Sequence, residues 1–404
     1  MSWRLARVPA LLVLIGGCAR TGLVTDPRVD PPVVRASDAG SVGVDAGATT
    51  RDGGVRPTTC RPACAVVGEA SDVVRVSLPG ADGSMNVFLG DFALVAGQPL
   101  VAWGAYTCCV GFGERRAAGG VLRLPDGEVL AGVGPTASTR VGIGPRVTGV
   151  DATVLVLDPL EGFRHARWLD ANTGEVTRES TAPVRSDAST PPAIARLAAG
   201  GFAVLEGPDL QLVVLDEDLV ELSRTPLGRT DVRHLQLTEL PGGRRLASWR
   251  RLELLESLVV DAEGRSVEPV VELGVELPYD GYEYASAVSD GCRVELTTAS
   301  SVVEVGEDGQ IVARTRLPFP AFGALSTGEG LLVLERGDGR DGGPRVVLLE
   351  RETGRELREL AAMDNSLGYA SAGALGLGDG AAWFATSSYV TRGAVDYVPV
   401  ACRD

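Results

Sequence analysis

The sequence predicts an all-β fold of the β-propeller type with seven four-stranded blades, six or eight blades being the alternatives. Three observations support this prediction. The 404-residue chain has 52 glycines and only 5% aromatic residues, which is typical of many short strands joined by tight turns. Its apolar residues come in short runs of valine and leucine rather than at helical spacing. A unit of about 45 residues recurs along the chain, and this length matches one propeller blade.

The clearest part of the repeat is a hairpin with an acidic, glycine-containing turn, as in SLVVDAEGRSVEPV and VVEVGEDGQIVART. A glycine in such a turn supplies the positive φ that a tight hairpin needs. Gly264, Gly309 and Gly354 follow one another at intervals of 45 residues, and Gly174 precedes Gly264 by 90. Leu219 lies at the midpoint of that longer interval, so the acidic turn just before it is predicted to be a further copy.

A second hairpin precedes each of these turns, and its second strand is strongly apolar. One such strand is predicted for each blade, at Leu100–Tyr106, Val154–Asp158, Phe202–Glu206, Arg245–Arg250, Cys292–Thr297, Leu331–Glu335 and Ala382–Ser387. A single four-stranded sheet cannot bury both of its faces, so the blades must pack on one another around an axis. Trp103, Trp249 and Trp383 fall on these strands and are predicted to fill the space between neighbouring blades.

The last repeat has only three predicted strands, at Ala370–Leu377, Ala381–Tyr389 and Ala394–Cys402. Its outer strand is expected to come from the N-terminal side of the domain, either from Asp72–Leu78 or from Met85–Leu89. Completing the last blade in this way would close the ring and remove an open sheet edge.

One turn carries a resemblance to known propellers. Asp170-Ala171-Asn172-Thr173-Gly174 is a D-x-x-T-G turn, which resembles the turns of quinoprotein-like, WD40-like and outer-membrane-assembly propellers. The resemblance covers the architecture of roughly residues 70–404. Quinoprotein repeats carry a tryptophan after this turn, whereas Glu175-Val176-Thr177-Arg178 follows here. The resemblance therefore implies the propeller without a quinone, and no cofactor is expected.

The N-terminus has the layout of a secretory signal over residues 1–17. Arg4 and Arg7 precede an apolar run from Ala10 to Ile15, which is too short to span a bilayer as a helix. Ile15-Gly16-Gly17-Cys18 resembles a bacterial lipobox, which implies cleavage before Cys18 and lipidation of its thiol. An ordinary signal peptide with an incidental cysteine is the alternative.

Residues 18–59 are rich in Pro, Gly, Asp, Ala and Thr and contain no aromatic residue. Such a segment cannot bury enough apolar surface to fold, so it is predicted to be a disordered tether leading to the propeller at residues 60–404. Acyl chains on Cys18 would anchor the chain in the lipid bilayer. In lipoproteins, an Asp after the cysteine marks inner-membrane retention; Ala19 stands there instead, so the resemblance implies an exported lipoprotein of the outer membrane.

Six further cysteines are candidates for disulfide bonds: Cys60, Cys64, Cys108, Cys109, Cys292 and Cys402. An even number of cysteines in an exported chain predicts disulfides. Cys402 ends the last repeat, and Cys60 and Cys64 precede the strand expected to complete it, so we expect Cys402 to bond to one of these two. The adjacent Cys108 and Cys109 form a vicinal disulfide or pair elsewhere, and Cys292 bonds to a loop or stays a buried thiol. Zinc bound by Cys60, Cys64, Cys108 and Cys109 is the weaker alternative, and no metal is expected.

Charge and motifs narrow the function. The formal net charge is −15, which disfavours nucleic acid as a partner. All 38 basic residues are arginine, and four lie close together in sequence, Arg244, Arg245, Arg250 and Arg251, either as solvated strand edges or as a patch for an anionic ligand or partner. His165 and His234 have no nucleophile motif beside them, and no G-x-S-x-G, H-E-x-x-H or P-loop pattern appears, so no catalytic residue is predicted.

These observations favour a membrane-anchored, non-catalytic binding or scaffold protein that contacts a protein or glycan through one face of the propeller. One alternative is a periplasmic propeller enzyme of the lyase or quinoprotein-dehydrogenase type, because Cys108-Cys109 resembles the cysteine pair of quinoprotein alcohol dehydrogenases. Another is an assembly factor like the lipoproteins of the outer-membrane β-barrel machinery. Carboxylates, arginine and histidine clustered at the central channel would favour an enzyme, whereas small apolar residues with exposed aromatics at one rim would favour a binding protein.

Overall fold

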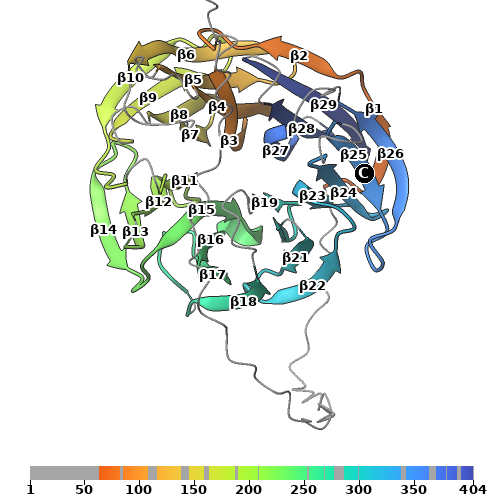
Figure 1. The fold of residues 1–404 in the computed structure, drawn as a ribbon. Helices are drawn as coiled ribbons and strands as arrows, with labels where there is room; N and C mark the ends of the chain where they lie inside the picture. Colours follow the sequence, from red (N-terminus) through yellow and green to blue (C-terminus); the bar gives the residue numbers. More distant parts are fainter. Residues whose placement is uncertain are drawn as a thin grey trace, which may run out of the picture. The chain divides into compact units, whose positions relative to one another are not determined.

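The computed structural model describes most of residues 63–403 (Figure 1). The described part leaves out residues 82–84, 108–115, 138–144, 159–162, 187–189, 208, 253, 268, 277–285, 299, 338–342, 364–369, 379 and 389–392. The predicted signal segment and the whole predicted tether, Cys18 included, therefore lie outside the described residues. Within the part of the chain that the structure describes, no helix has the length and apolar character needed to cross a membrane.

Seven antiparallel sheets follow one another along the chain, and they are called blades 1 to 7 here. Blades 1 to 3 contain, in chain order, β3 (Met85–Val95), β4 (Gln98–Thr107), β5 (Arg116–Arg123), β6 (Glu128–Ala137); β7 (Arg146–Val150), β8 (Thr153–Asp158), β9 (His165–Asp170), β10 (Val176–Thr181); and β11 (Ala193–Arg196), β12 (Phe202–Glu206), β13 (Gln211–Leu215), β14 (Glu221–Pro226). Blades 4 to 6 contain β15 (Val232–Glu239), β16 (Arg245–Arg251), β17 (Leu254–Val260), β18 (Val271–Glu276); β19 (Ser286–Ser289), β20 (Val294–Thr297), β21 (Ser301–Val305), β22 (Ile311–Arg316); and β23 (Ala321–Ser326), β24 (Leu331–Glu335), β25 (Arg345–Leu349), β26 (Glu356–Ala362). Blade 7 contains β27 (Ala370–Gly378), β28 (Ala381–Ser388) and β29 (Ala394–Arg403), together with β1 (Val66–Ala70) and β2 (Val74–Ser77).

The sheets surround a common centre, with the first strand of each consecutive set innermost and the fourth outermost (Figure 1). The prediction of a seven-bladed all-β propeller is therefore confirmed. The seven apolar second strands predicted from the sequence are also confirmed as β4, β8, β12, β16, β20, β24 and β28.

The hydrophobic core is divided among the contacts between neighbouring blades. Seven clusters of buried apolar side chains are found in the described residues, and each is centred on two adjacent blades. In one of them Leu155 and Leu157 of blade 2 pack with Phe202 and Val204 of blade 3. Fully burying such a side chain stabilises the fold by about 1.5–3 kcal/mol. Every blade contributes to two of these cores, so each blade depends on its two neighbours for stability.

The turns between third and fourth strands have the predicted backbone. Gly174 has a φ of 70°, and a Cβ built on it would lie 2.3 Å from the Leu130 carbonyl oxygen of blade 1, so only glycine fits there. Leu219, at the same position in blade 3, also has a positive φ, of 62°. Its side chain is buried in the core between blades 2 and 3, which compensates for the strained backbone.

The last blade is completed by the N-terminal part of the domain, as predicted, but by a different set of residues. Both β1 and β2 pair antiparallel with β29, β2 along its first half and β1 along its second half. The prediction of Asp72–Leu78 is therefore confirmed in β2. The alternative, Met85–Leu89, is wrong, because those residues begin β3, the innermost strand of blade 1.

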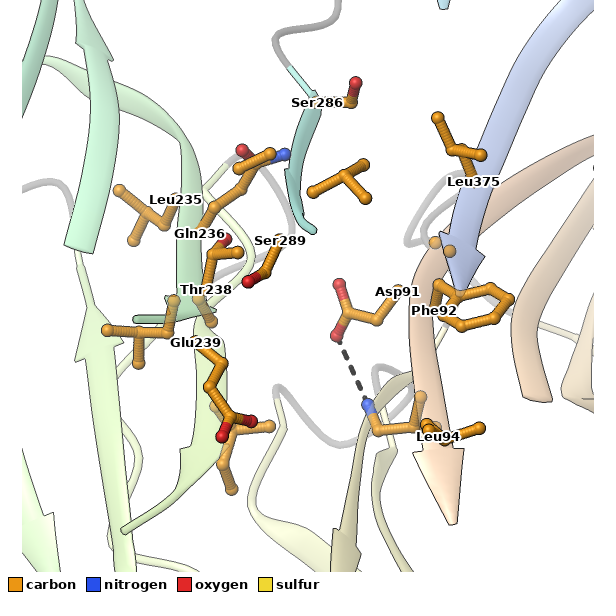
Figure 2. Close-up of a pocket in the computed structure, with 18 of the residues that line it drawn as sticks. Asp91, Phe92, Leu94, Leu235, Gln236, Thr238, Glu239, Ser286, Ser289 and Leu375 are labelled. Atoms are coloured by element: carbon orange, nitrogen blue, oxygen red, sulfur yellow. Dashed lines mark hydrogen bonds between the residues drawn. The ribbon is translucent and has the colours of Figure 1, made fainter. Parts of the chain in front are cut away.

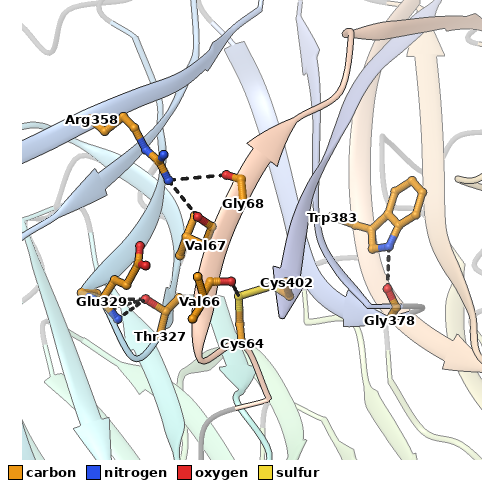
Figure 3. Close-up of a disulfide and its surroundings, with 11 residues drawn as sticks. Cys64, Val66, Val67, Gly68, Thr327, Glu329, Arg358, Gly378, Trp383 and Cys402 are labelled. Carbon is orange, nitrogen blue, oxygen red and sulfur yellow. Dashed lines mark hydrogen bonds between the residues drawn. A yellow bond between two sulfur atoms is a disulfide. The ribbon is translucent and has the colours of Figure 1, made fainter. Parts of the chain in front are cut away.

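A disulfide joins the two ends of the ring, as expected for Cys402. Cys64 is its partner across 338 residues of sequence, with a Cα–Cα distance of 4.8 Å (Figure 3). Arg358 of blade 6 reinforces the closing strand, since its Nη2 donates to the carbonyl oxygen of Val67 at 2.9 Å. The bond also excludes Cys64 from the alternative zinc site.

The three tryptophans on second strands lie in the cores between blades, as predicted. Trp103 and Trp383 belong to one cluster between blades 7 and 1, and Trp249 belongs to the cluster between blades 3 and 4. Trp103 and Trp249 are completely buried. Trp249 donates its Nε1–H to Glu256 at 2.7 Å, and Trp383 donates to the carbonyl oxygen of Gly378 at 2.9 Å.

Candidate functional site

A cavity of about 1060 Å³ occupies the centre of the ring. The innermost strand of each of the seven blades contributes to its wall (Figures 1 and 2). Much of the wall is apolar, as at Phe92, Phe322 and Leu375, but charged and polar side chains interrupt it. A concave, largely apolar site with a few polar groups is the usual form of a ligand site in proteins.

Two bulges bring charged or ionisable residues into this cavity. The pairing of β3 with β4 shifts between Leu89 and Phe92, and Asp91 lies in the irregular segment. The pairing of β15 with β16 shifts between Arg233 and Gln236, and His234 lies in that segment with a φ of 53°. Bulges redirect side chains, and non-glycine residues in the left-handed region are strained. The pairing of the inner strands is therefore irregular where Asp91 and His234 line the cavity.

Asp91 is held by the neighbouring blade. Its Oδ1 lies 2.6 Å from Nη1 of Arg146 on β7, and its Oδ2 accepts a hydrogen bond from the Val147 N–H at 3.2 Å. Burial raises the pKa of Asp91 above its ordinary value, and the charge of Arg146 opposes this shift. Figure 2 shows the Asp91 carboxylate pointing into the cavity. The pair joins blades 1 and 2 and puts one polar anchor in the wall.

His234 lies in a positive environment. Burial and, after it, the charges of Arg250, Arg146 and Arg233 together lower its pKa from 6.5 to about 4. The imidazole is therefore neutral at pH 7 and has one N–H donor and one acceptor nitrogen. A base with a pKa this far below neutrality accepts a proton weakly, so the ring is better suited to hydrogen bonding than to general base catalysis.

The opposite wall of the cavity is polar without an excess of charge. Gln236 and Thr238 of β15 and Ser289 of β19 face the same space as Asp91 in Figure 2. Glu239 ends β15, and its Oε2 lies 2.9 Å from Nη1 of Arg245. Hydroxyl, amide and paired carboxylate groups on this wall can orient a polar ligand.

The four arginines singled out in the sequence do not form one open patch. Arg244 and Arg245 precede or begin β16, whereas Arg250 and Arg251 end it. Nη2 of Arg244 lies 3.0 Å from Oε2 of Glu307 on the fifth blade. The structure thus separates the first pair from the second by most of a strand.

The second pair is also engaged within the fold. Arg250 is buried, and its Nε donates to the carbonyl oxygen of Leu252 at 2.8 Å. Nη2 of Arg251 lies 3.0 Å from Oε1 of the buried Glu256. Of the four, only Arg250 is close enough to act electrostatically on His234.

The remaining predicted site residues are cysteines. Cys292 is disulfide-bonded, so the alternative that it stays a buried thiol does not hold. Cys18, Cys60, Cys108 and Cys109 lie outside the described residues, and so does any vicinal pair or zinc site that they form. In the described part of the chain no three His, Cys, Asp or Glu side chains are placed to hold a metal ion.

Sequence reasoning missed the residues that line the cavity. The sequence analysis does not single out Asp91, Arg146, Arg233 or Gln236. It predicts His234 to be a surface or strand residue and not a catalyst. The available signal was weak: the innermost strand VRHLQLTE carries an arginine and a histidine side by side. Bulges have no sequence pattern of their own, so the orientation of these side chains was not predictable.

Comparisons with known proteins bear on the architecture. No protein-family model matches this chain, and no curated protein sequence matches it. The WD40 domain of Neurospora crassa Pan2 is similar with a TM-score of 0.51 at 10% identity, over 84% of this chain and 98% of that domain. Virginiamycin B lyase from Staphylococcus aureus is similar with a TM-score of 0.48 at 12% identity, over 81% of this chain and 99% of the lyase. The Dos1 propeller has a TM-score of 0.48 at 11% identity, over 82% of this chain and 95% of its own. At such identities only the fold is shared, and the chain is accordingly a seven-bladed β-propeller of the WD40-like architecture.

Proposed function

We propose that this chain is an exported lipoprotein of the outer membrane whose propeller binds a protein or glycan partner in its central cavity without transforming it. The observation that carries the binding role is the cavity of about 1060 Å³, to which all seven blades contribute lining residues. The strained His234 and the Asp91–Arg146 pair give that space fixed polar groups. Fixed donors and acceptors in an apolar wall provide specificity of binding.

The path of the chain at the edge of the cavity supports the anchored arrangement. Ala63 lines the cavity, and its N–H donates to the carbonyl oxygen of Asp290 at 3.0 Å. The Gly328 N–H donates to the carbonyl oxygen of Cys64 at 3.1 Å. The segment that follows the proposed tether is therefore fixed at the end of the ring where the hairpin turns of blades 5 and 6 lie. The proposed tether is therefore joined to the propeller at this end of the ring.

The membrane anchor is tested on the purified protein. Mass spectrometry of the mature chain is expected to find Cys18 as the first residue, carrying acyl chains. The variant Cys18→Ala is expected to lose stable association with the membrane fraction, because several acyl chains are needed for stable anchoring. An unprocessed N-terminus, or an unmodified Cys18 in a membrane-associated chain, would contradict the proposal.

The binding role is tested by site-specific photo-crosslinking in cells. A photoreactive amino acid at Gln236, in the cavity, is expected to give discrete crosslinked species of one mass. The matched position is Leu222, which is 65% exposed on the outermost strand of blade 3, and it is expected to give none. Equal crosslinking from both positions, or crosslinking from Leu222 alone, would contradict binding in the cavity.

A propeller enzyme is the second candidate, because the cavity wall brings together a carboxylate, arginines and a histidine. Asp91, Arg146 and His234 are the residues concerned. The weak basicity of His234 and the pairing of Asp91 with Arg146 favour binding over proton transfer. Mass spectrometry of the ligand after incubation with the protein decides between the two, because a bound ligand is recovered unchanged and a substrate is converted.

A further inference from the structure

We propose that the bulge of β15 forms an oxyanion site, in which Arg233 and His234 hold a carboxylate, phosphate or sulfate group of the ligand. This inference rests on the proposed function, because it names the chemistry of the ligand that the same cavity takes. It is carried by the balance of charge along the cavity wall and by the backbone of the bulge.

The charges that line the cavity are compensated at all but one position. Asp91 is paired with Arg146, and Glu239 is paired with Arg245. Arg233 is exposed to the cavity and makes no ion pair or side-chain hydrogen bond with any residue that the structure describes. Among the described residues of the cavity wall, Arg233 is thus the one guanidinium without an ion-pair partner, in a protein whose net charge is −15.

A second guanidinium lies directly across the sheet from the first. Arg233 pairs in register with Arg250 of β16, and Arg250 is buried. Like charges at directly opposed positions destabilise a sheet. An oxyanion beside Arg233 reverses this repulsion, and a guanidinium recognises carboxylate and phosphate oxygens with two parallel hydrogen bonds.

His234 lies next to Arg233 in the same bulge and lines the same cavity. The positive charges of Arg146 on β7, Arg233 on β15 and Arg250 on β16 all lower the pKa of its ring. The carboxylate of Asp91 on β3, which also lines the cavity, forms its ion pair with Arg146. The same positive charges that oppose protonation of the imidazole attract an anion to this part of the cavity wall. The φ of 53° at His234 shows that the backbone is strained to keep the ring at this place.

The test uses nuclear magnetic resonance of the untagged full chain with isotope-labelled histidine. The chain has only two histidines, so His165 serves as an internal control for His234. Sodium sulfate is titrated against sodium chloride at equal ionic strength, and the pKa of each ring is followed. We expect saturating sulfate to raise the pKa of His234 from about 4 by about one unit, because an adjacent anion favours the charged form, and to leave His165 unchanged.

Variants show whether Arg233 carries the site. Arg233→Gln is expected to weaken sulfate binding about tenfold, and Arg233→Lys is expected to retain part of the affinity. Arg265→Gln is the matched control, because Arg265 is an exposed arginine on the outer turn of the same blade and is expected to change nothing. Separate titrations with inorganic phosphate and D-glucuronate distinguish a phosphate source of the oxyanion from a carboxylate source.

The outcomes of these experiments distinguish failure of the oxyanion site from failure of the proposed binding role. If sulfate, phosphate and glucuronate all leave His234 unshifted relative to chloride, or if Arg233→Gln binds them as the unaltered chain does, the oxyanion site is wrong. Crosslinking from Gln236 would still report a ligand in the cavity in that case, so the binding role would stand. Loss of crosslinking together with a normal sulfate response would overturn the binding role instead.

Discussion

The middle strands of several blades and the innermost strand of blade 4 differ in burial and in regularity. All five residues of β12 are buried, and β8 and β24 each have a single residue that is not. In β15, the innermost strand of blade 4, only two of eight residues are buried, and its pairing shifts at the bulge. These three middle strands are almost completely buried and pair in regular register with the third strand of their blade, whereas the innermost strand of blade 4 is irregular and mostly not buried.

This difference separates stability from binding in the molecule. The cores between blades lie on the middle strands, so the free energy of folding comes mainly from them. The inner strands surround the cavity, and they carry the strained His234 and the paired Asp91. Strain at a site that binds is tolerated when the surrounding structure is stable enough to impose it.

The largest expected effect concerns a middle strand. Phe202→Ala in β12 is expected to lower the free energy of unfolding by about 3–5 kcal/mol, because it leaves a cavity in the core between blades 2 and 3. Thr238→Ala in β15 is its counterpart on an inner strand and is expected to change stability by about 0.5 kcal/mol or less. Urea unfolding of the two variants measures both values, and equal losses would remove the distinction between the two kinds of strand.

Removing the disulfide between Cys64 and Cys402 tests how much this bond adds to the stability of the closed ring. Cys64→Ser is expected to lower the free energy of unfolding by about 2–4 kcal/mol, because the bond constrains a very long loop in the unfolded chain. Cys402→Ser should give the same loss, and so should the double variant. Unfolding under non-reducing conditions measures this, and unequal losses in the two single variants would show that burial of one side chain dominates.

His234 makes the stability of the inner strands depend on pH. Its pKa is lowered from an ordinary 6.5 to about 4 in the folded chain, so the unfolded state takes up the proton first as the pH falls. Stability from this residue is full above pH 6.5 and is lost between pH 6.5 and about 4. The expected loss is about 2 kcal/mol, after allowance for partial exposure of the ring.

The variant His234→Gln isolates this contribution from the other groups that titrate in the same range. Its free energy of unfolding should fall less than that of the unaltered chain between pH 6.5 and 4, as measured by urea unfolding at half-unit steps. His165→Gln is the control and should follow the unaltered chain. A parallel pH dependence in all three proteins would show that His234 is not held neutral by its surroundings.

The same distinction explains how much the sequence could predict. The second strands are short, continuous apolar runs bounded by glycine turns, so their number and order follow from the sequence, as at Phe202–Glu206 and Leu331–Glu335. The turn at Leu219 was found from spacing alone, although leucine is a poor residue for a positive φ. Closure by Cys402 followed from the incomplete last repeat.

The cavity was not predictable, for a physical reason. Asp91 and Arg146 are 55 residues apart in sequence and become partners only because adjacent blades bring β3 and β7 together. The bulge at His234 depends on how β15 pairs with β16, which no local pattern encodes. The choice of Met85–Leu89 as a closing strand failed similarly, because an inner strand and an outer strand have the same local pattern.

Glu295, a buried acid on the middle strand β20, gives the smallest predicted effect. Glu295 of β20 is completely buried and faces Glu304 across the sheet. Burial raises the pKa of Glu295 well above its ordinary value, and the negative charge of Asp290 raises it further. When folding raises the pKa of an acid, the folded protein loses stability as the pH rises from the ordinary pKa towards the raised one.

Glu295→Gln keeps the shape of the side chain and removes its charge, so we expect it to stabilise the chain by about 1 kcal/mol at pH 8 and by nothing at pH 4. Urea unfolding at the two pH values measures the difference. A variant that is less stable at both pH values would mean that the carboxyl makes an interaction that glutamine cannot replace.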